Sequence, residues 1–514
     1  MTPESVPVVI VGAGPTGITA ATLLAHYGID CLVLDRWESV YPQPRAVHLD
    51  DEINRLIARL GIADEFAAIS RPAMGLRLLD RDLRVMAQFD RDTTASIHGF
   101  PQANMFDQPE LEALLRANLK RHSGVRLRGN SEVIEINQHA PGRVRVTYAD
   151  RTTGDKRIVD AAYLLGCDGA NSVARASIGA AMEDLRFEQR WLVADVITDA
   201  QLNQWDGVHQ VCSPVRAATY MRIGPTRYRW EFRLLAHETA DDYSTLDALR
   251  GLIAPWVNDI PDNDLEVVRV TEYTFRAQIA NRWRDRNVFL LGDAAHLTPP
   301  FIGQGMGAGL RDAMNLVWKL AGVLSGDLSP GVLDTYQQER KPHARKMISL
   351  ALVIGWAMTA GGGLGNVLRH AIAPRLHLVP GLREKIVNSR TPALCRSALV
   401  MKRRAPRQLA GTLCPNPVLI SGERLDTVFG NEFALITTKQ PIANESALLE
   451  KRGAVVHIAE PGSELARWLR RGNATAAVVR PDRTVMCAGR NLTALCAAMP
   501  AFHRTSLQRK ESSR

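Results

Sequence analysis

Three glycines near the N-terminus have the spacing of a phosphate-binding turn. Gly12, Gly14 and Gly17 follow a buried-strand pattern at residues 7–11 and open a helical pattern at residues 15–27. In such a turn the first glycine permits the tight bend, the second lets the backbone approach a pyrophosphate, and the third allows the helix to pack on the strand. The free N–H groups of the helix N-terminus favour a bound phosphate.

The strand that follows supports this interpretation. Residues 31–34 are apolar and end at Asp35, 23 residues after Gly12, where a carboxylate can accept a hydrogen bond from a ribose hydroxyl. This unit predicts a bound dinucleotide and leaves FAD and NAD(P) both open. A glycine-rich turn that binds no ligand is the structural alternative.

Two later segments decide between the cofactors. Residues 166–175, around Asp168, and residues 291–319, around Asp293, each follow an apolar strand pattern. With the first turn, they resemble the three fingerprints of the flavoprotein aromatic hydroxylases, which are FAD-dependent class A flavoprotein monooxygenases. Within this family residues 5–345 look most like the 3-(3-hydroxyphenyl)propionate hydroxylases.

The resemblance implies a role for each matched residue. It places Asp293 at a ribityl hydroxyl of FAD, Arg45 and Gln108 at the flavin, and Asp168 at the pyrophosphate or in NAD(P)H handling. The structural alternatives are a helix cap, a surface arginine, a plain helix start and a turn, respectively. The implied FAD-binding residues are Gly12, Gly14, Pro15, Thr16, Gly17, Asp35, Arg36, Arg45, Gln108, Asp168, Gly292, Asp293, Pro300, Gly303, Gln304, Gly305 and Met306.

The substrate side is less specified by the sequence. His48 lies three residues after Arg45, and an alternating pattern later in the chain carries Arg216, Tyr220 and Arg222. These four side chains are candidate contacts for a carboxylate or a phenol, with ordinary sheet-surface positions as the alternative. No pair or triad of residues indicates a catalytic acid or base. No Cys-x-x-Cys pair or other metal-ligand spacing is present.

The resemblance implies a monooxygenase that uses FAD, O2 and either NADH or NADPH. A flavin C4a-hydroperoxide would hydroxylate a phenolic aromatic acid such as 3-(3-hydroxyphenyl)propionate. Because no cysteine matches a covalent flavin link, FAD is expected to be bound non-covalently. Alternative functions are hydroxylation of larger polyketide-type phenols, a flavoprotein halogenase or oxidase, and a non-catalytic FAD-fold binding protein. A halogenase would carry a Trp-x-Trp-x-Ile-Pro segment, which the sequence around Trp191 lacks.

The pattern of predicted elements indicates an α/β protein with three structural units. A Rossmann-like FAD-binding domain alternates strands and helices, and a substrate domain has antiparallel strand patterns. After residue 405 a fresh strand–helix alternation suggests a small separate α/β domain, and its segment 478–482 resembles the thioredoxin-like end domain of phenol hydroxylase relatives. The predicted boundaries are 1–75, 100–185 and 281–345 for the FAD-binding domain, 76–99 and 186–280 for the substrate domain, 346–404 for a helical segment, and 405–514 for the C-terminal domain.

Composition excludes several classes of protein. With 514 residues and 46% hydrophobic residues the chain is not intrinsically disordered, and its net charge of +9 is too dilute to predict a nucleic-acid partner. Seven scattered cysteines suggest a reducing, cytoplasmic location. The apolar stretch at 347–360 is short of the roughly 20 residues that span a membrane, so no membrane association is expected. The sequence does not fix the oligomeric state, and a homodimer is one alternative.

Overall fold

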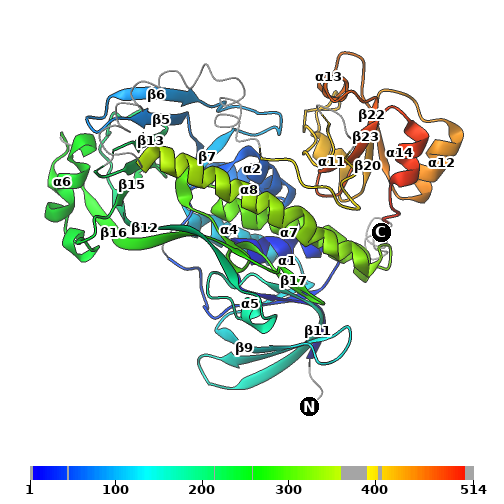
Figure 1. Cartoon of the computed structure of the whole chain (residues 1–514), viewed down its shortest axis with the longest axis horizontal. Coiled ribbons are helices and arrows are strands. Elements are labelled where there is room, and N and C mark those ends of the chain that lie inside the picture. Colours follow the sequence, from blue (N-terminus) through cyan, green and yellow to red (C-terminus); the bar gives the residue numbers. More distant parts are fainter. Residues whose placement is uncertain are drawn as a thin grey trace.

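The structure is a computed structural model that describes residues 4–42, 45–213, 215–257, 259–359, 391–402 and 408–503. Figure 1 shows three parts: a sheet near the N-terminus, a second sheet beside α6, and a C-terminal α/β unit. The α/β fold class predicted from the sequence is confirmed. The domain boundaries remain a prediction, and most of the predicted helical segment 346–404 lies outside the described residues.

The first sheet has a parallel centre of five strands in the order β18-β11-β1-β2-β8, with β17 antiparallel at one edge. β10 pairs antiparallel with β11, and β9 pairs antiparallel with β10. Its central strands are buried on both faces, as continuous apolar runs require. The strands are β1 (Glu4–Val11), β2 (Cys31–Leu34), β8 (Val125–Arg128), β9 (Ser131–Asn137), β10 (Val144–Asp150), β11 (Lys156–Gly166), β17 (Arg284–Asp285) and β18 (Val288–Leu290).

Helices cover this sheet and bring the glycine-rich segments together. The glycine turn connects β1 to the first helix, which packs against α7 in the hydrophobic core. A small sheet β3-β7-β4 lies next to these helices. The elements are α1 (Pro15–His26), β3 (His48–Asp50), α2 (Asp51–Arg59), α3 (Ala63–Ile69), β4 (Ser70–Pro72), β7 (Ala103–Phe106), α4 (Gln108–Leu119), α5 (Val173–Ser177), α7 (Gly305–Leu324) and α8 (Asp334–Thr359).

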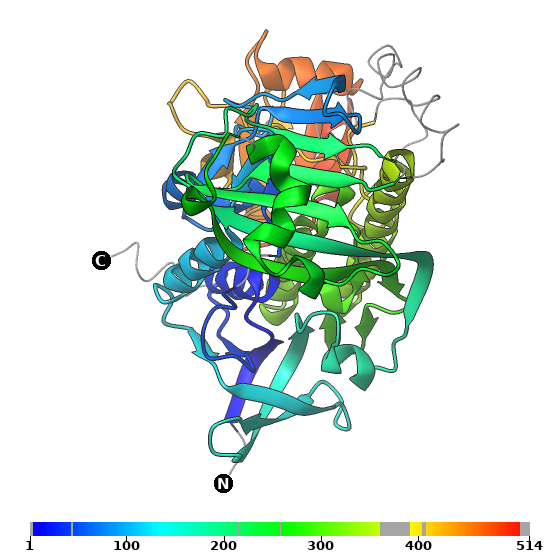
Figure 2. The same cartoon turned by 90° about the vertical axis from the view of Figure 1, so that its left-hand side faces the viewer.

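The second sheet has eight strands in the order β19-β16-β12-β15-β14-β13-β5-β6. Most pairs are antiparallel as predicted, but β13 pairs with β5 in parallel because β5 comes from an early excursion of the chain. Figure 2 shows α6 lying across one face of this sheet. The elements are β5 (Gly75–Leu79), β6 (Val85–Asp90), β12 (Met182–Ile197), β13 (Val208–Val211), β14 (Ala218–Arg222), β15 (Arg227–Arg233), α6 (Leu246–Val257), β16 (Glu266–Ala280) and β19 (His296–Leu297).

The C-terminal unit has four strands in the order β21-β20-β22-β23, of which β20 and β21 are parallel and the others antiparallel. This βαβαββα arrangement is compatible with a thioredoxin-like domain, which stays a prediction. The elements are α11 (Leu425–Phe429), β20 (Ala434–Thr437), α12 (Ala443–Lys451), β21 (Val455–Ile458), α13 (Glu464–Arg471), β22 (Ala476–Val479), β23 (Val485–Gly489) and α14 (Leu492–Ala498).

Buried ion pairs join the C-terminal unit to the helices of the first part. Glu339 of α8 accepts hydrogen bonds from Lys319 of α7 and from Arg480 after β22, each at 2.9 Å. All three side chains are fully buried. Although burial opposes ionisation, Arg480 and Lys319 lower the pKa of Glu339 to about 2. A buried carboxylate between two cations therefore fixes the two units against each other.

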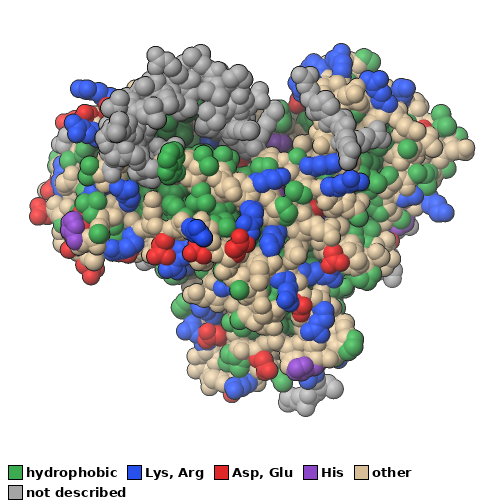
Figure 3. All heavy atoms as spheres, viewed as in Figure 1, with side chains coloured by type: hydrophobic (Ala, Val, Ile, Leu, Met, Phe, Trp, Pro, Cys, Tyr) green, Lys and Arg blue, Asp and Glu red, His purple; other side chains and the backbone are tan. Residues whose placement is uncertain are grey.

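The surface agrees with the dilute charge of the sequence. Figure 3 shows Lys and Arg side chains scattered over one face and interspersed with Asp and Glu. No helix of the described residues is long and apolar enough to cross a membrane. Within the same residues, no group of three or more His, Cys, Asp or Glu could hold a metal ion.

Replacing Glu339 by Ala should lower the free energy of unfolding by about 3–5 kcal/mol, because two buried cations lose their shared carboxylate. Urea denaturation followed by tryptophan fluorescence would measure the loss. The matched control is Glu183→Ala, which removes an exposed carboxylate paired with Arg345 and should change stability little. Equal stability of the two variants would contradict this role of Glu339.

Candidate functional site

The three glycines of the first turn have the geometry that the sequence predicts. Gly12 has φ +99°, and a Cβ there would lie 2.3 Å from the Cys167 carbonyl oxygen. A Cβ on Gly17 would lie 1.9 Å from the Gly12 carbonyl oxygen, so α1 packs directly on the turn. A Cβ on Gly14 would have no atom within 4 Å. The turn is therefore closed at its first and third glycines and open at the second.

The first turn of α1 has free backbone donors. Gly14 is the N-cap and supplies no side-chain acceptor, and Pro15 begins the helix. The N-terminal N–H groups and the positive end of the helix dipole therefore face the open side of the turn, which suits a phosphate group.

Asp35 connects the turn to the second strand. One carboxylate oxygen accepts from the Ala13 N–H at 2.5 Å and the other from the Trp37 N–H at 2.7 Å. Arg36 next to it is exposed and lies over the Trp37 ring at 5.3 Å. Each oxygen of Asp35 keeps a second lone pair for a ribose hydroxyl. The ribose contact of Asp35 and the cofactor contact of Arg36 stay predictions.

Asp168 supports the start of the short helix α5, whose N-cap is Ser172. Its oxygens accept from the Ser172 hydroxyl at 2.6 Å and from the Ala174 N–H at 2.9 Å. Burial raises the pKa of its carboxyl group. These contacts match the structural alternative, a turn at a helix start, and the predicted cofactor contact of Asp168 remains a prediction.

Gln108 positions the backbone at Arg45. The Gln108 side-chain oxygen accepts from the N–H groups of Arg45 at 3.0 Å and Ala46 at 2.6 Å, and its amide donates to Glu112 at 2.6 Å. The Arg45 side chain is exposed and lies over the ring of Tyr41 at 5.1 Å. The amide of Gln108 is therefore used to hold the Arg45 loop, while the guanidinium of Arg45 is accessible.

Thr16, Gly292 and Gly309 form a close contact between α1, α7 and the end of β18. Cβ atoms on Gly292 and Gly309 would lie 3.0 and 2.3 Å from the Thr16 hydroxyl oxygen. Gly292 also has φ +59°. Larger residues at either position would push the three backbone segments apart.

The carboxylate of Asp293, next in the chain, has no hydrogen-bond partner among the described residues. The side chain is accessible to solvent, yet the surrounding protein removes enough water to raise the pKa of its carboxyl group. The carboxylate is therefore surrounded by protein but still within reach of a ligand. An unpaired carboxylate in such a position is a suitable acceptor for a ligand hydroxyl group.

The segment 300–306 has a left-handed turn against His48. Gly303 has φ +60°, and a Cβ there would lie 2.7 Å from the His48 Nδ1 atom. Gln304 is the N-cap of α7 but does not cap it with its side chain. Gly305 begins the helix, and a Cβ on it would come no closer than 3.9 Å to another residue outside the helix. The N-terminus of α7 therefore has free N–H groups, as α1 does.

Two charged networks that sequence reasoning missed hold these glycine segments. In the first, Arg311 donates to Gln304 at 2.9 Å and to Asp50 at 2.6 Å, while the Gln304 amide donates to Asp50 at 2.7 Å. The Gln304 side chain is thereby directed away from the helix N-terminus. The acidic sequence 50–52 at the start of α2 is a signal that could have indicated this network.

The second network has Asp312 at its centre. Its carboxylate accepts from the Gly292 N–H at 3.1 Å, from His296 at 2.8 Å and from Arg340 at 2.8 Å. His296 is buried and is used for this structural contact. The carboxylate fixes the turn that carries Asp293.

The structure does not bring Arg216, Tyr220 and Arg222 to His48. Arg216 pairs with Glu238. Tyr220 is 2% exposed and packs with Trp256 in the core under α6, and Arg222 donates to backbone carbonyls of the β14–β15 turn. Their substrate contacts remain predictions that these packing partners do not favour.

The arginine that lies beside His48 is Arg91. One of its terminal nitrogens is 3.0 Å from Nε2 of His48, whose Nδ1 is 3.5 Å from the Gly303 carbonyl oxygen. Burial and Arg91 lower the pKa of His48 to about 4, so the imidazole is neutral at pH 7. Arg91 itself forms no salt bridge within the described residues, and burial lowers its pKa. An enclosed guanidinium with unused donors is thus next to the segment 300–306.

An aromatic cluster joins this segment to the second sheet. The Phe301 ring lies 5.6 Å from Phe187 and 6.1 Å from Trp191, measured between ring centroids. A Cβ on Gly355 of α8 would lie 2.3 Å from the Phe301 ring. Phe301 is therefore enclosed by the sheet on one side and by α8 on the other.

These features together fit FAD. Two uncapped helix N-termini, the open side of Gly14 and the unpaired carboxylate of Asp293 would suit a pyrophosphate, a flavin edge and a ribityl chain. A family model described as an FAD binding domain matches residues 5–351. The chain belongs to the FAD-dependent aromatic hydroxylase family. Together with the hydroxylase relatives described next, this makes the chain an FAD-dependent aromatic monooxygenase, as the sequence predicted.

Relatives with curated names support this assignment over most of the chain. A 3-(3-hydroxy-phenyl)propionate/3-hydroxycinnamic acid hydroxylase of Burkholderia vietnamiensis is 33% identical over 93% of this chain and 92% of the relative. A Rhodococcus jostii protein named "Probable NADH-specific resorcinol 4-hydroxylase" is 36% identical over 69% of this chain and 66% of the relative. Both names are those of hydroxylases, and neither is that of a halogenase.

Solved structures share the whole fold. Aklavinone-11 hydroxylase in a complex with FAD and aklavinone has a TM-score of 0.80 and 25% identity, over 97% of this chain and 99% of that one. The flavin-dependent monooxygenase PieE, with FAD and substrate, has a TM-score of 0.78 and 23% identity over the same shares. The second of these likenesses is evidence for the fold alone.

Gly14→Ala should fold like the parent protein but lose FAD affinity, because the added methyl group meets no protein atom and projects into the open side of the turn. The FAD content after gel filtration and the melting temperature of the apoprotein would measure the two effects. Gly251→Ala on α6, where a Cβ also meets nothing within 4 Å, is the matched control. Normal FAD retention by Gly14→Ala would contradict a pyrophosphate at this turn.

Asp293→Ala should weaken FAD binding by roughly 1.5–3 kcal/mol, the cost of losing a charged hydrogen-bond acceptor, which corresponds to about 10- to 150-fold in Kd. Fluorescence titration of the apoprotein with FAD would measure it. Asp247→Ala removes an exposed carboxylate on α6 and serves as the control. If both variants bind FAD like the parent, Asp293 has only a structural role.

Proposed function

We propose that the protein hydroxylates a phenol that carries a carboxylate side chain, such as 3-(3-hydroxyphenyl)propionate, with O2 and NADH or NADPH as co-substrates. The observation that carries the choice of substrate is the enclosed guanidinium of Arg91 beside His48 and Gly303. The name of the Burkholderia vietnamiensis relative supports the same class of substrate.

The proposed FAD site consists of the sequence-predicted residues and the two helix N-termini. The pyrophosphate would lie at α1, the ribityl chain at Asp293, and the flavin ring beside residues 300–306. The positive end of α7 would stabilise negative charge on the pyrimidine side of the ring. When bound, FAD supplies the chemistry that takes a hydride from NAD(P)H and transfers one oxygen atom of O2 to the substrate.

Arg91 would bind the substrate carboxylate. A guanidinium presents several donors in a planar fork, and its hydrogen bonds to a carboxylate are charge-assisted and strongest where water is excluded. His48 accepts one of these donors because its ring is neutral, which holds the guanidinium next to Gly303. The remaining donors can orient a carboxylate so that the phenol ring faces the flavin.

The aromatic cluster would exclude water from the reacting atoms. Phe301 follows Pro300 in the proposed flavin segment and contacts Trp191 of the second sheet. Trp191 is 2% exposed, so it covers this side of the segment with an apolar ring. Exclusion of water favours oxygen transfer to the ring over wasteful reduction of O2. This role needs no titrating catalytic pair, in agreement with the sequence.

We further propose that the protein acts in the cytoplasm and forms a homodimer. The seven cysteines support a reducing compartment, since all of them are free in the structure. The likeness to aklavinone-11 hydroxylase supports a large polycyclic phenol as the second candidate substrate, and the Rhodococcus jostii relative supports resorcinol.

The substrate class can be tested by measuring NAD(P)H oxidation and product formation with 3-(3-hydroxyphenyl)propionate, its methyl ester, resorcinol and a polycyclic phenol. The free acid should give the highest kcat/KM, and its product should carry a new hydroxyl ortho or para to the first. If the ester or the polycyclic phenol is hydroxylated well and the acid is not, the acid-binding proposal is wrong, while the family assignment stands.

Arg91→Gln should raise KM for the free acid by about 10- to 100-fold, the size expected for a lost charged hydrogen bond, and should leave KM for resorcinol nearly unchanged. Steady-state kinetics with both substrates measure this difference. Arg216→Gln and Arg222→Gln test the arginines chosen from the sequence. A KM increase for the acid in these variants and not in Arg91→Gln would transfer the carboxylate contact to them.

A further inference from the structure

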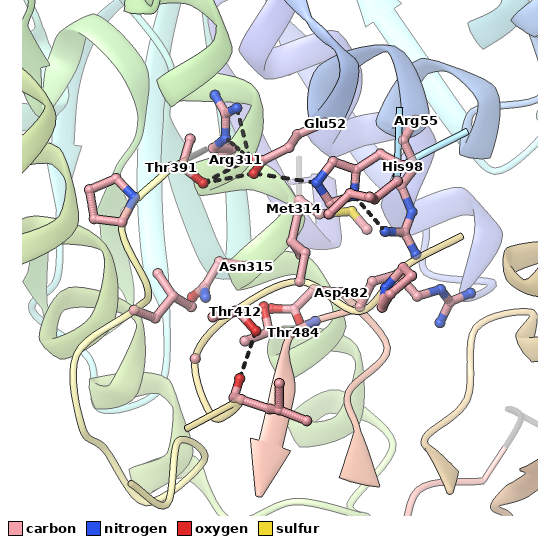
Figure 4. Close-up of a pocket in the computed structure, with 18 of the residues that line it drawn as sticks. Glu52, Arg55, His98, Arg311, Met314, Asn315, Thr391, Thr412, Asp482 and Thr484 are labelled. Atoms are coloured by element: carbon pink, nitrogen blue, oxygen red, sulfur yellow. Dashed lines mark hydrogen bonds and ion pairs between the residues drawn. The ribbon is translucent and has the colours of Figure 1, made fainter. Parts of the chain in front are cut away.

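A second pocket lies between the helices of the first part and the C-terminal unit. Its volume is ≈ 520 Å³, within the range of pockets that bind small organic molecules. Figure 4 shows Glu52, Arg55 and Arg311 at one end of it and Asp482 and Thr484 at the other. None of the FAD-binding residues implied by the sequence lines this pocket. It is therefore a separate site.

Cationic side chains exceed anionic ones where α2 meets α11. Arg55 donates to both carboxylate oxygens of Asp426 at 2.7 Å, and Arg483 donates to the same carboxylate at 2.7 Å. Arg59, one helical turn after Arg55, has only weak contacts, with Asn431 at 3.4 Å and with the sulfur of Met314 at 3.7 Å. Three guanidinium groups thus share one carboxylate.

The charge of Arg59 is not balanced by its own ion pair. Within the described residues Arg59 forms no salt bridge, and burial together with the charge of Arg483 lowers its pKa to about 10. A guanidinium that is enclosed and lacks a carboxylate binds an anion more readily than one that is already paired. This is the donor that the pocket offers to a ligand.

The other titratable groups of the pocket do not balance Arg59. Burial lowers the pKa of His98 to about 3 and that of His343 well below its usual value, so both are neutral. Glu52 is held by Arg311, and burial raises the pKa of its carboxyl group. The remaining acidic side chain, Asp482, pairs with Arg480. Arg340 pairs with Asp312, and Arg471 is exposed and adds positive charge.

Part of the wall is apolar. Ile97, Leu409, Trp468 and Met314 line the pocket with the charged groups. An apolar wall beside a cation fits a ligand that has a hydrophobic body and one anionic group, rather than a small inorganic ion.

We propose that this interdomain pocket is a second ligand site, which binds a small organic anion with its carboxylate or phosphate group on Arg59 and its apolar body against the Trp468 and Leu409 side.

The experiment is isothermal titration of the FAD-loaded enzyme with 3-phenylpropionate, which has the carboxylate but no phenol hydroxyl group. The Arg91→Gln background weakens the proposed substrate site, so the remaining binding reports the interdomain pocket. In that background, adding Arg59→Gln should weaken 3-phenylpropionate binding at least tenfold. Arg467→Gln, an exposed arginine on α13 outside the pocket lining, should leave it unchanged.

Further ligands and a second variant test the same proposal. The neutral 3-phenylpropanamide should bind at least tenfold more weakly than the acid. If Arg59→Gln does not fold, Arg59→Lys takes its place; it keeps the charge and should retain only part of the affinity of the background. Phenyl phosphate distinguishes a phosphate ligand from a carboxylate ligand. Equal binding in folded Arg59→Gln and its background, or binding of inorganic phosphate but of neither organic anion, would overturn the proposal.

Discussion

The site depends on the close approach of three backbone segments around the side chain of Thr16. The starts of α1 and α7 and the turn after β18 meet there, at distances that leave no space for a Cβ on Gly292 or Gly309. Because the helices meet near their first turns, two sets of free N–H groups and two positive dipole ends are concentrated in one region. An anionic cofactor is the natural counterpart of such a region. Glycine at these positions is therefore required by packing before any contact with a ligand is considered.

Buried charges extend this arrangement to the rest of the chain. Asp312 fixes the Gly292 turn, and Arg311, the residue before it, fixes Gln304 at the start of α7. The same Arg311 also holds Glu52, which faces the interdomain pocket. One turn of α7 thus connects the proposed flavin segment, the start of α2 and the boundary with the C-terminal unit. Such networks are rigid because breaking any one contact leaves a charge buried without a partner.

The sequence predicted the parts of the fold that have a strong local signal. The strand at 31–34 has the predicted bounds, because it is a short apolar run that follows a helical pattern and ends at Asp35. The three-residue strands β3 and β4 carry polar residues and have no period to detect. The parallel pairing of β5 with β13 joins segments far apart in the chain, so no local pattern could reveal it.

The candidate site likewise has residues that a local sequence pattern reveals and residues that it does not. The glycines of the FAD segments could be found because their spacing is itself the signal. Arg91 could not be found, since its significance comes from its contact with His48, 43 residues earlier, and from its having no salt bridge within the described residues. Arg216 was attractive in sequence because of its strand, but Glu238 already neutralises it. Whether an arginine is available to a ligand depends on its partners, and partners are a property of the folded chain.

The pairing of Arg55 with Asp426 has a consequence for how the chain is made. The two residues are 371 positions apart, and Glu339 precedes its partner Arg480 by 141 positions. A ribosome releases the N-terminal part first, so Arg55 emerges long before its carboxylate exists. The contacts of the FAD-binding part with the C-terminal unit are therefore complete only after Asp426 and Arg480 have been synthesised. A chain that stops before Asp426 would leave the Arg55 guanidinium without this carboxylate and would be less stable than the full chain.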